Sequence, residues 1–222
     1  GIKAIEVSSD HYRSFFPQAS KISTIIDLIE KGFIKPSELC WFHDLDVFQN
    51  EVITEKELEL DGIDIALCDK GRMPRWGTGS MFFRERAKDI FGFIKEISDK
   101  YKINEEPAFN AITSNNILWA TEQRPEDVIF DKFVPANIPG TENINERVKK
   151  LNISYNFAGW NISSCYKMAV KPIRAVHFHP LDNDAIYGGM SALDFFLHGK
   201  NKLGVHLVPE RLIKIFHKHG VK

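Results

Sequence analysis

The stretch Leu39-Cys40-Trp41-Phe42, followed directly by His43-Asp44-Leu45-Asp46, decides the fold expected for this chain. A short, continuous apolar run is typical of a buried strand, and its acidic neighbours mark the point where the strand leaves the core. Two carboxylates that flank one residue at such a point can converge on one hard cation or on its bound water. We therefore predict that Asp44 and Asp46 bind a divalent metal ion. The alternative is that they only begin a turn and solvate the strand end.

Apolar periodicity on both sides of this stretch predicts an α/β fold. Residues spaced as on a helix face indicate one helix that follows Ser20, its expected cap, and stops at Gly32, and a second helix over residues 87–101. A terminal helix is expected after Pro209. Because strands and helices alternate, we expect a mixed sheet flanked by helices, with a helical appendage at the carboxyl terminus. Further strands are predicted at residues 2–7, 63–68, 80–83, 128–130 and 173–178.

Composition and charge restrict the class of protein. The chain has 222 residues, of which 29 are Lys or Arg and 30 are Asp or Glu, so no strong electrostatic field favours nucleic acid as a partner. It contains no apolar run of the ~20 residues that span a bilayer, and no signal-peptide pattern. The three widely spaced cysteines suit a reducing compartment. We therefore expect a cytoplasmic protein, or one on the cytoplasmic face of a membrane.

The expected organisation is a catalytic domain over residues 1–185, with a helical extension over residues 186–222 packed on it. The polar, proline-punctuated segment 121–146 is interpreted as a long excursion and not as a domain boundary. The chain opens on a strand-like run, Ile2–Val7, without a methionine, so we expect further residues to precede Gly1.

Two further segments could carry chemistry. In His177-Phe178-His179 alternate side chains share one face of a strand, so both imidazoles could serve one site as metal ligands. Hydrogen-bonded structure is the alternative for these histidines. Gly77-Thr78-Gly79 permits close approach of a ligand to the backbone, or else makes a turn before the next strand.

A pair of carboxylates, Glu105 and Glu106, stands at the expected start of a helix near Pro107, where the helix dipole stabilises negative charge. The functional alternative is that one of them binds a sugar hydroxyl or acts on an acceptor proton. Neighbouring residues at a helix start point about 100° apart, so the two carboxylates are expected to face different atoms.

Taken in order, these segments resemble the metal-dependent GT-A fold glycosyltransferases of the bacterial galactosyltransferase and glycogenin type, which hold a metal ion on an Asp-x-Asp motif. The resemblance covers roughly residues 20 to 180, and it is carried by the collinear order of short motifs. The motifs are Phe42-His43-Asp44-Leu45-Asp46-Val47, Gly79-Ser80-Met81-Phe82-Phe83-Arg84, Glu105-Glu106-Pro107-Ala108-Phe109-Asn110, Tyr155-Asn156-Phe157 and Val176-His177-Phe178.

This resemblance implies an enzyme that moves a sugar from a nucleotide-sugar donor, expected to be a UDP-sugar, to a hydroxyl of a glycan or another acceptor. It implies that Asp44, Asp46 and His177 ligate manganese or magnesium, which bridges the diphosphate. Catalytic roles would fall on Glu105, as a contact of the donor sugar, and on Glu106, which would line the reacting face. The donor-binding residues so implied are Lys21, Thr78, Gly79, Glu105 and His179.

Departures from the family leave other interpretations open. The family's glycine and Lys-Pro-Trp after the last histidine are replaced by residues 179–182, and its first nucleotide-binding strand and helix are not recognisable. For Lys21, a solvated position on the helix face is the favoured interpretation. The Asp44 motif also resembles the nucleophile motif of haloacid-dehalogenase-like phosphatases, in which Asp44 would attack phosphorus. A non-catalytic glycan-binding protein on the same fold is the other rival, and Asp182 and Asp184 are the next carboxylates to consider.

Overall fold

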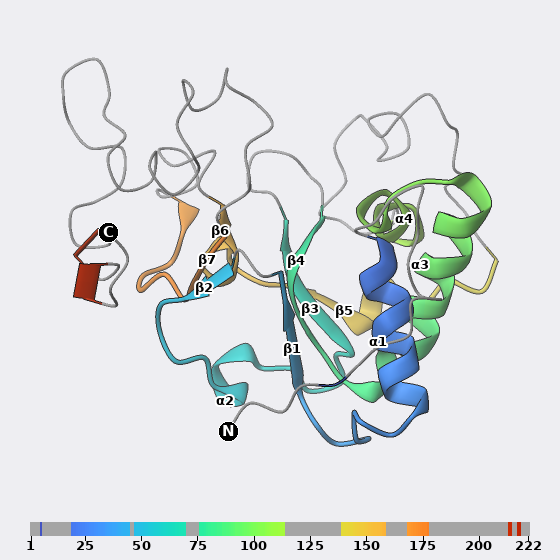
Figure 1. Cartoon of the computed structure of the whole chain (residues 1–222), viewed down its shortest axis with the longest axis horizontal. Coiled ribbons are helices and arrows are strands. Elements are labelled where there is room, and N and C mark those ends of the chain that lie inside the picture. Colours follow the sequence, from blue (N-terminus) through green and yellow to red (C-terminus); the bar gives the residue numbers. More distant parts are fainter. Residues whose placement is uncertain are drawn as a thin grey trace, which may run out of the picture.

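A computed structural model describes residues 5, 19–44, 47–69, 76–113, 139–158, 168–177, 213–214 and 217–218 of the chain. In these ranges the chain forms a four-stranded sheet, a smaller three-stranded sheet, and helices that gather mainly on one side of the larger sheet (Figure 1). The mixed α/β fold with flanking helices that the sequence predicted is confirmed.

The larger sheet has the strand order β1-β4-β3-β5 and contains both strand directions. β4 pairs antiparallel with β1 and with β3, whereas β3 pairs parallel with β5. β1 is therefore an edge strand, which explains why its side chains are half-buried or exposed where the sequence predicted a buried strand. β4 has a neighbour on each side and is buried throughout. The strands are β1 (Cys40–His43), β4 (Trp76–Phe83), β3 (Ile65–Asp69) and β5 (Val148–Lys150).

Three helices lie together on one side of this sheet, with α1 packed against α3 and α3 against α4 (Figure 1). They are α1 (Ser20–Glu30), α3 (Lys88–Tyr101), which follows the 3-10 helix η3 (Glu85–Ala87), and α4 (Glu105–Ile112). The three helices predicted up to residue 112 are thus confirmed. The expected cap is wrong, because Ser20 is the first helical residue and Ala19 holds the capping position without a side-chain hydrogen bond.

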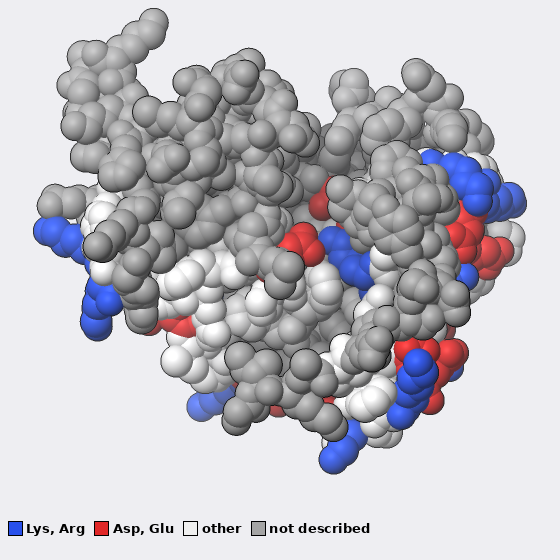
Figure 2. Space-filling model, in the orientation of Figure 1, with Lys and Arg blue, Asp and Glu red and all other residues white. Residues whose placement is uncertain are grey.

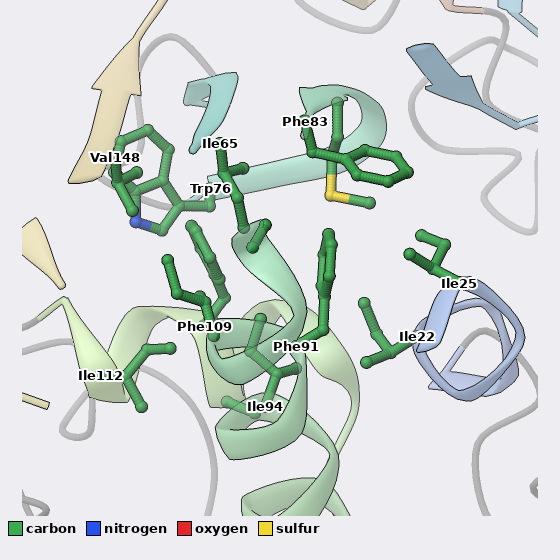
Figure 3. Packing of buried hydrophobic residues seen from close by; sticks show 14 of the residues in the cluster. Ile22, Ile25, Ile65, Trp76, Phe83, Phe91, Ile94, Phe109, Ile112 and Val148 are labelled. Carbon is green, nitrogen blue, oxygen red and sulfur yellow. The ribbon is translucent and has the colours of Figure 1, made fainter. Parts of the chain in front are cut away.

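The main core fills the space between these helices and the sheet. Because successive side chains of a strand point to opposite faces, Ile65 and Leu67 of β3 join this core, whereas Ala66 and Cys68 pack on the other face. Burial of each large apolar side chain contributes about 1.5–3 kcal/mol. Figure 3 shows side chains from the helices pointing toward side chains from the strands: Ile22, Ile25, Phe91, Ile94, Phe109 and Ile112 toward Ile65, Trp76, Phe83 and Val148.

A short helix that the sequence analysis missed, α2 (Glu55–Leu58), contributes to the opposite face through the buried Leu58. The hydroxyl of Thr54 caps it by accepting a hydrogen bond from the amide of Glu57 at 3.4 Å. The Thr-x-x-Glu spacing is a helix-start signal, so a search for capping residues would have found this helix.

The smaller sheet has the order β2-β7-β6, with β7 antiparallel to β2 and parallel to β6. In Figure 1 it lies on the side of β1 and β4 away from α1, α3 and α4. The strand predicted at 173–178 contains β7, which begins at Ala175. The elements are β2 (Val47–Gln49), β7 (Ala175–His177) and β6 (Phe157–Ala158), and the 3-10 helices η5 (Asn145–Arg147) and η6 (Ile153–Tyr155) precede β5 and β6.

Several predicted features fall outside the described residues: the strand at 128–130, nearly all of the strand at 2–7, and most of the extension at 186–222. The division between residues 185 and 186 therefore stays a prediction. Among the helices that the described ranges contain, none has the length and apolar character needed to cross a bilayer.

Candidate functional site

The first half of β4 forms the floor of the candidate site. Gly77-Thr78-Gly79 lies inside this strand, so the turn considered for it is wrong. A Cβ added to Gly79 would collide with Cε1 of His177, and would stand 2.7 Å from Nδ1 of that ring and 3.1 Å from Oδ2 of Asp44. The absence of a side chain at Gly79 is therefore what allows the imidazole and the carboxylate to meet over the strand.

Asp44 follows directly after β1, and its amide donates a hydrogen bond to the carbonyl of Gly79 at 2.9 Å. Its two carboxylate oxygens face different neighbours. Oδ1 lies 3.4 Å from Nζ of Lys21, and Oδ2 lies 4.0 Å from Nε2 of His177. Asp44 thus connects a lysine-containing cluster on one side with a histidine on the other.

His177 reaches the site because it ends β7, where it pairs with Val47 of β2 and with Ala158 of β6. Its side chain is buried, and its Nδ1 lies 3.1 Å from Oδ1 of Asn156. The short strand β2 begins three residues after Asp44, so the small sheet ties the predicted metal ligands together through the backbone.

The residues present fit a divalent metal ion as two members of a ligand set. Oxygen and imidazole nitrogen together suit a borderline cation such as Mn²⁺. Two ligands at right angles on bonds of about 2.1 Å stand about 3 Å apart, so the 4.0 Å between Asp44 and His177 requires only a small side-chain movement. The described residues contain no group of three or more His, Cys, Asp or Glu side chains placed for a metal. The third predicted ligand, Asp46, lies outside them.

The side chain of Lys21 is only 10% exposed, so the solvated position favoured for it from the sequence is wrong. Its Nζ lies 2.9 Å from Oε1 of Glu105 and 3.2 Å from Oγ1 of Thr78, in addition to its contact with Asp44. Burial lowers the pKa of the Lys21 amine, but the attraction of Glu105 and Asp44 outweighs burial and raises the pKa above its ordinary value. A lysine in the first turn of a helix is disfavoured by the helix dipole, and these carboxylates offset that cost.

Glu105 and Glu106 occupy the first turn of α4, as predicted. Oγ1 of Thr78 donates to Oε1 of Glu105 at 2.7 Å, and the amide of Thr78 donates to Oε1 of Glu106 at 3.2 Å. Oγ1 of Thr78 also lies 3.5 Å from Oε1 of Glu106. The expectation that the two carboxylates face different atoms is therefore wrong, because their side chains are long enough to turn back onto the same threonine.

Contacts that the sequence analysis missed hold α4 against the start of β4. The amide of Trp76 donates to Oδ1 of Asn110 at 3.1 Å, and its indole Nε1 donates to Oγ1 of Thr113 at 2.8 Å. Asn110 is the later asparagine of the helix motif, so the signal was present without a role attached to it. These two bonds fix the distance from α4 to Thr78, two residues along β4.

The remaining predicted site residues, His179 and the reserve carboxylates Asp182 and Asp184, lie outside the described residues. Of the predicted set, the structure brings together Lys21, Asp44, Thr78, Gly79, Glu105, Glu106 and His177. Figure 2 shows basic atoms beside acidic atoms near the middle of the face drawn, apart from a larger group of charges at its right-hand edge.

Comparisons with known proteins give distant structural likenesses. No protein-family model matches the chain, and no curated protein matches it in sequence. The chain is similar to a glycosyltransferase involved in the glycosylation of the major capsid of PBCV-1, with 17% identity and a TM-score of 0.42 over 79% of this chain and 75% of that one. It is similar to the glycosyltransferase GlyE of Streptococcus pneumoniae TIGR4, with 12% identity and a TM-score of 0.47 over 95% of this chain and 49% of that one. The chain spans about half the length of GlyE.

Proposed function

We propose that the chain is a metal-dependent glycosyltransferase, which moves a sugar from a nucleotide-diphosphate donor to a hydroxyl of a glycan or another acceptor. The observation that carries the proposal is the arrangement around Asp44. One of its carboxylate oxygens faces Lys21 and the other faces His177. Next to them, the carboxylates of Glu105 and Glu106 both accept hydrogen bonds from Thr78 of β4. The proposed cation site, at Asp44 and His177, is thus connected through Lys21 to the proposed hydroxyl-binding site at Glu105.

The balance of charge in this cluster supports a bound cation. Among the described residues, Lys21 is the one ammonium that forms ion pairs with two carboxylates, those of Asp44 and Glu105. Lys21 and Glu105 are almost fully buried, so solvent screens their charges poorly. An excess of negative charge in such a place is relieved by a further cation, and the carboxylate oxygens suit Mg²⁺ or Mn²⁺.

Asp44 and His177, together with Asp46, would hold this manganese or magnesium ion, whose positive charge stabilises a nucleoside diphosphate as it leaves. Lys21 offsets part of the charge of Asp44 and Glu105 and keeps both side chains in place. Gly79 leaves room for the carboxylate and the imidazole to approach each other. His179 is proposed as a further contact of the donor.

One oxygen of Glu105 supports the proposal that a sugar binds next to this ion. Oε2 of Glu105 is buried and has no hydrogen-bond partner among the described residues, whereas its Oε1 is held by Lys21 and Thr78. Buried polar atoms are nearly always hydrogen-bonded, so we propose that a bound ligand donates a hydrogen bond to Oε2. A sugar hydroxyl supplies one. Glu106, held by the amide of Thr78, is proposed to line the side on which the acceptor reacts.

A donor screen tests the proposal. Nucleotide release from UDP-, GDP- and other nucleotide-sugars is measured with Mn²⁺, with Mg²⁺ and with a chelator. We expect release with at least one donor, dependent on the ion and lost in Asp44→Asn. The matched control is Asp99→Asn, which removes an acidic partner of Lys95 on the exposed side of α3 and should keep full activity.

Two outcomes of the screen would contradict the proposal. Hydrolysis of a simple phosphate monoester, with a phosphorylated Asp44, would favour the phosphatase. Binding of glycans with no nucleotide-sugar turnover under any metal would favour the non-catalytic protein.

A further inference from the structure

The side chain of Asn156 touches the ring of His177 on the side away from Asp44. Oδ1 of Asn156 lies 3.1 Å from Nδ1 of His177, and both residues are buried, with exposed fractions of 6% and 3%. The other ring nitrogen, Nε2, is the one 4.0 Å from Asp44. The two ring nitrogens therefore have separate neighbours.

This contact selects one tautomer of the ring. An amide oxygen only accepts hydrogen bonds, so Nδ1 of His177 must carry the proton that is shared with Asn156. A neutral imidazole has one proton, and Nε2 is then left with a lone pair that points to the side of Asp44. That lone pair is what a metal ion needs from a histidine.

The position of the ring is fixed from a second direction by β4. The ring lies so close to Gly79 that a Cβ there would overlap it. The backbone of Asn156 is itself held in place, because its main-chain N–H donates a hydrogen bond to the carbonyl of Ile153 at 3.1 Å, at the end of η6. The imidazole ring is thus confined between the backbone at Gly79 and the side chain of Asn156. This leaves the ring little freedom to rotate Nε2 away from Asp44.

We propose that Asn156 is a positioning residue for metal binding: it fixes the tautomer and the orientation of His177 so that Nε2 is presented beside Asp44. The part of this inference that concerns the cation rests on the proposed function, whereas the assignment of the tautomer does not. Loss of a partner behind a metal-bound histidine lowers metal affinity by about 10- to 100-fold.

The first test measures the affinity of the full chain for Mn²⁺, from the electron paramagnetic resonance signal of free Mn²⁺, without donor or acceptor. Asn156→Leu removes the acceptor at similar volume and should weaken binding about 10- to 100-fold. Asn156→Asp keeps an acceptor at the same atom and should restore binding to within about 3-fold of wild type, given the scatter of such effects. Tyr155→Phe is the matched control, because it removes a neighbouring hydrogen bond, to Glu57, without touching His177.

Wild-type affinity in Asn156→Leu, or equal losses in Asn156→Leu and Tyr155→Phe, would overturn the proposal. The second test needs no variant of Asn156 and so holds even if those variants fail to fold. Long-range ¹⁵N–¹H spectra of the wild-type chain, with His177 assigned by its absence in His177→Gln, should show the proton on Nδ1. A proton on Nε2 would overturn the proposal. A wild-type chain that carries the proton on Nδ1 but binds no Mn²⁺ would instead refute the metal site of the proposed function.

Discussion

Two clusters of charged side chains in this molecule are built differently. The Lys21 cluster, at the start of β4, contains Lys21, Asp44, Thr78, Glu105 and Glu106, with one cation among three carboxylates. The Arg147 clamp, at the start of β3, contains Arg86, Arg147, Asp64 and Asp89, with two cations and two carboxylates.

The Arg147 clamp has the geometry of a structural tie. Nε of Arg147 lies 2.6 Å from Oδ2 of Asp64, while its Nη1 and Nη2 lie 2.6 Å and 2.7 Å from the two oxygens of Asp89. Nη2 of Arg86 lies 2.8 Å from Oδ1 of Asp64. Each aspartate oxygen lies within 2.8 Å of a guanidinium nitrogen, although Oδ1 of Asp64 forms an ion pair and no hydrogen bond, so the charges within the clamp balance. In the Lys21 cluster one oxygen of Glu105 has no hydrogen-bond partner among the described residues, and the side chains that define the cluster carry a net negative charge.

The largest effect is expected when the Lys21 cluster loses the carboxylate shared by its two sides. Asp44→Asn should lower metal-dependent kcat/KM by at least about 100-fold, because the amide is a poor ligand for a hard cation. The same loss is expected for Asp46→Asn. Stability should change little, because the substitution removes negative charge from a place that has an excess of it. Steady-state kinetics at saturating Mn²⁺, together with the thermal unfolding midpoint, measure both effects. Full metal-dependent turnover in Asp44→Asn would refute the metal assignment.

The opposite pattern is expected for the Arg147 clamp. Arg147→Met leaves the buried Asp64 with one partner and should lower the free energy of unfolding by about 2–3 kcal/mol, near the lower end for breaking a buried ion pair because Arg147 is partly exposed. The kcat/KM of the folded variant should stay within about 2-fold of wild type, since the substitution is remote from the site. Urea unfolding curves give the stability. Lys95→Met is the control, because it breaks a partly exposed pair with Asp99 and should cost about 0.5 kcal/mol or less. Intact stability with lost activity would show that the clamp belongs to the site.

The sequence predicts the residues of the candidate site better than their contacts. Asp44 and His177 were found because each follows or ends an apolar run, and Glu105 because it begins a helix; these are local patterns. The burial of Lys21 could not be read in the same way. Asp44 and Thr78 lie 23 and 57 residues from Lys21 in sequence, and Glu105 lies farther still. The residues near Lys21 in sequence therefore do not reveal its contacts.

The same limit applies to the backbone around the site. The glycines of Gly77-Thr78-Gly79 suggested a turn, because nothing local reveals that Asp44 and His177 need the space above Gly79. Asn156 was noticed in the Tyr-Asn-Phe motif without a role, because the ring it contacts lies 21 residues farther along the chain. Strand and helix patterns are set by neighbours in sequence, whereas these roles are set by tertiary contacts.

A smaller effect, within the Lys21 cluster, should separate its two glutamates. Glu105→Gln should mainly raise KM for the donor, by about 10-fold, because it alters a contact made in both the ground and the transition state. Glu106→Gln should mainly lower kcat, by about 10- to 100-fold, as expected for a group that acts on a proton during the reaction. Thr78→Val should show both effects more weakly, because Thr78 holds both carboxylates. Donor titrations at saturating metal decide this, and wild-type kinetics in all three variants would mean that the pair only caps and solvates α4.

The smallest effect concerns pH, and it distinguishes the two clusters by sign. Ion pairing raises the pKa of Lys21 above its ordinary 10.5, so the folded state holds this proton more tightly than the unfolded chain does. Its contribution to stability is complete below about pH 10.5 and is lost as the pH rises through the folded-state pKa. For Asp89 of the clamp, the hydrogen bonds and charge of Arg147 lower the pKa below 3.8, so its contribution is complete above about pH 3.8 and is lost as the pH falls. The stability difference between wild type and Lys21→Met should therefore shrink at the alkaline end, whereas that between wild type and Asp89→Asn should shrink only at the acid end. The Asp89 difference should be about 0.5 kcal/mol, because its carboxylate is half exposed and screened, and the Lys21 difference should be larger because its amine is buried. Urea unfolding between pH 3 and pH 11.5 (roughly one unit beyond each ordinary pKa) measures both.

Addition of Mn²⁺ should stabilise the unbalanced Lys21 cluster in Lys21→Met and leave Asp89→Asn unaffected relative to wild type, since only the first variant leaves carboxylates without a cation. A Lys21→Met difference that persists undiminished at the alkaline end would mean that the charge of the amine does not stabilise the fold, and the contrast between the two clusters would fail.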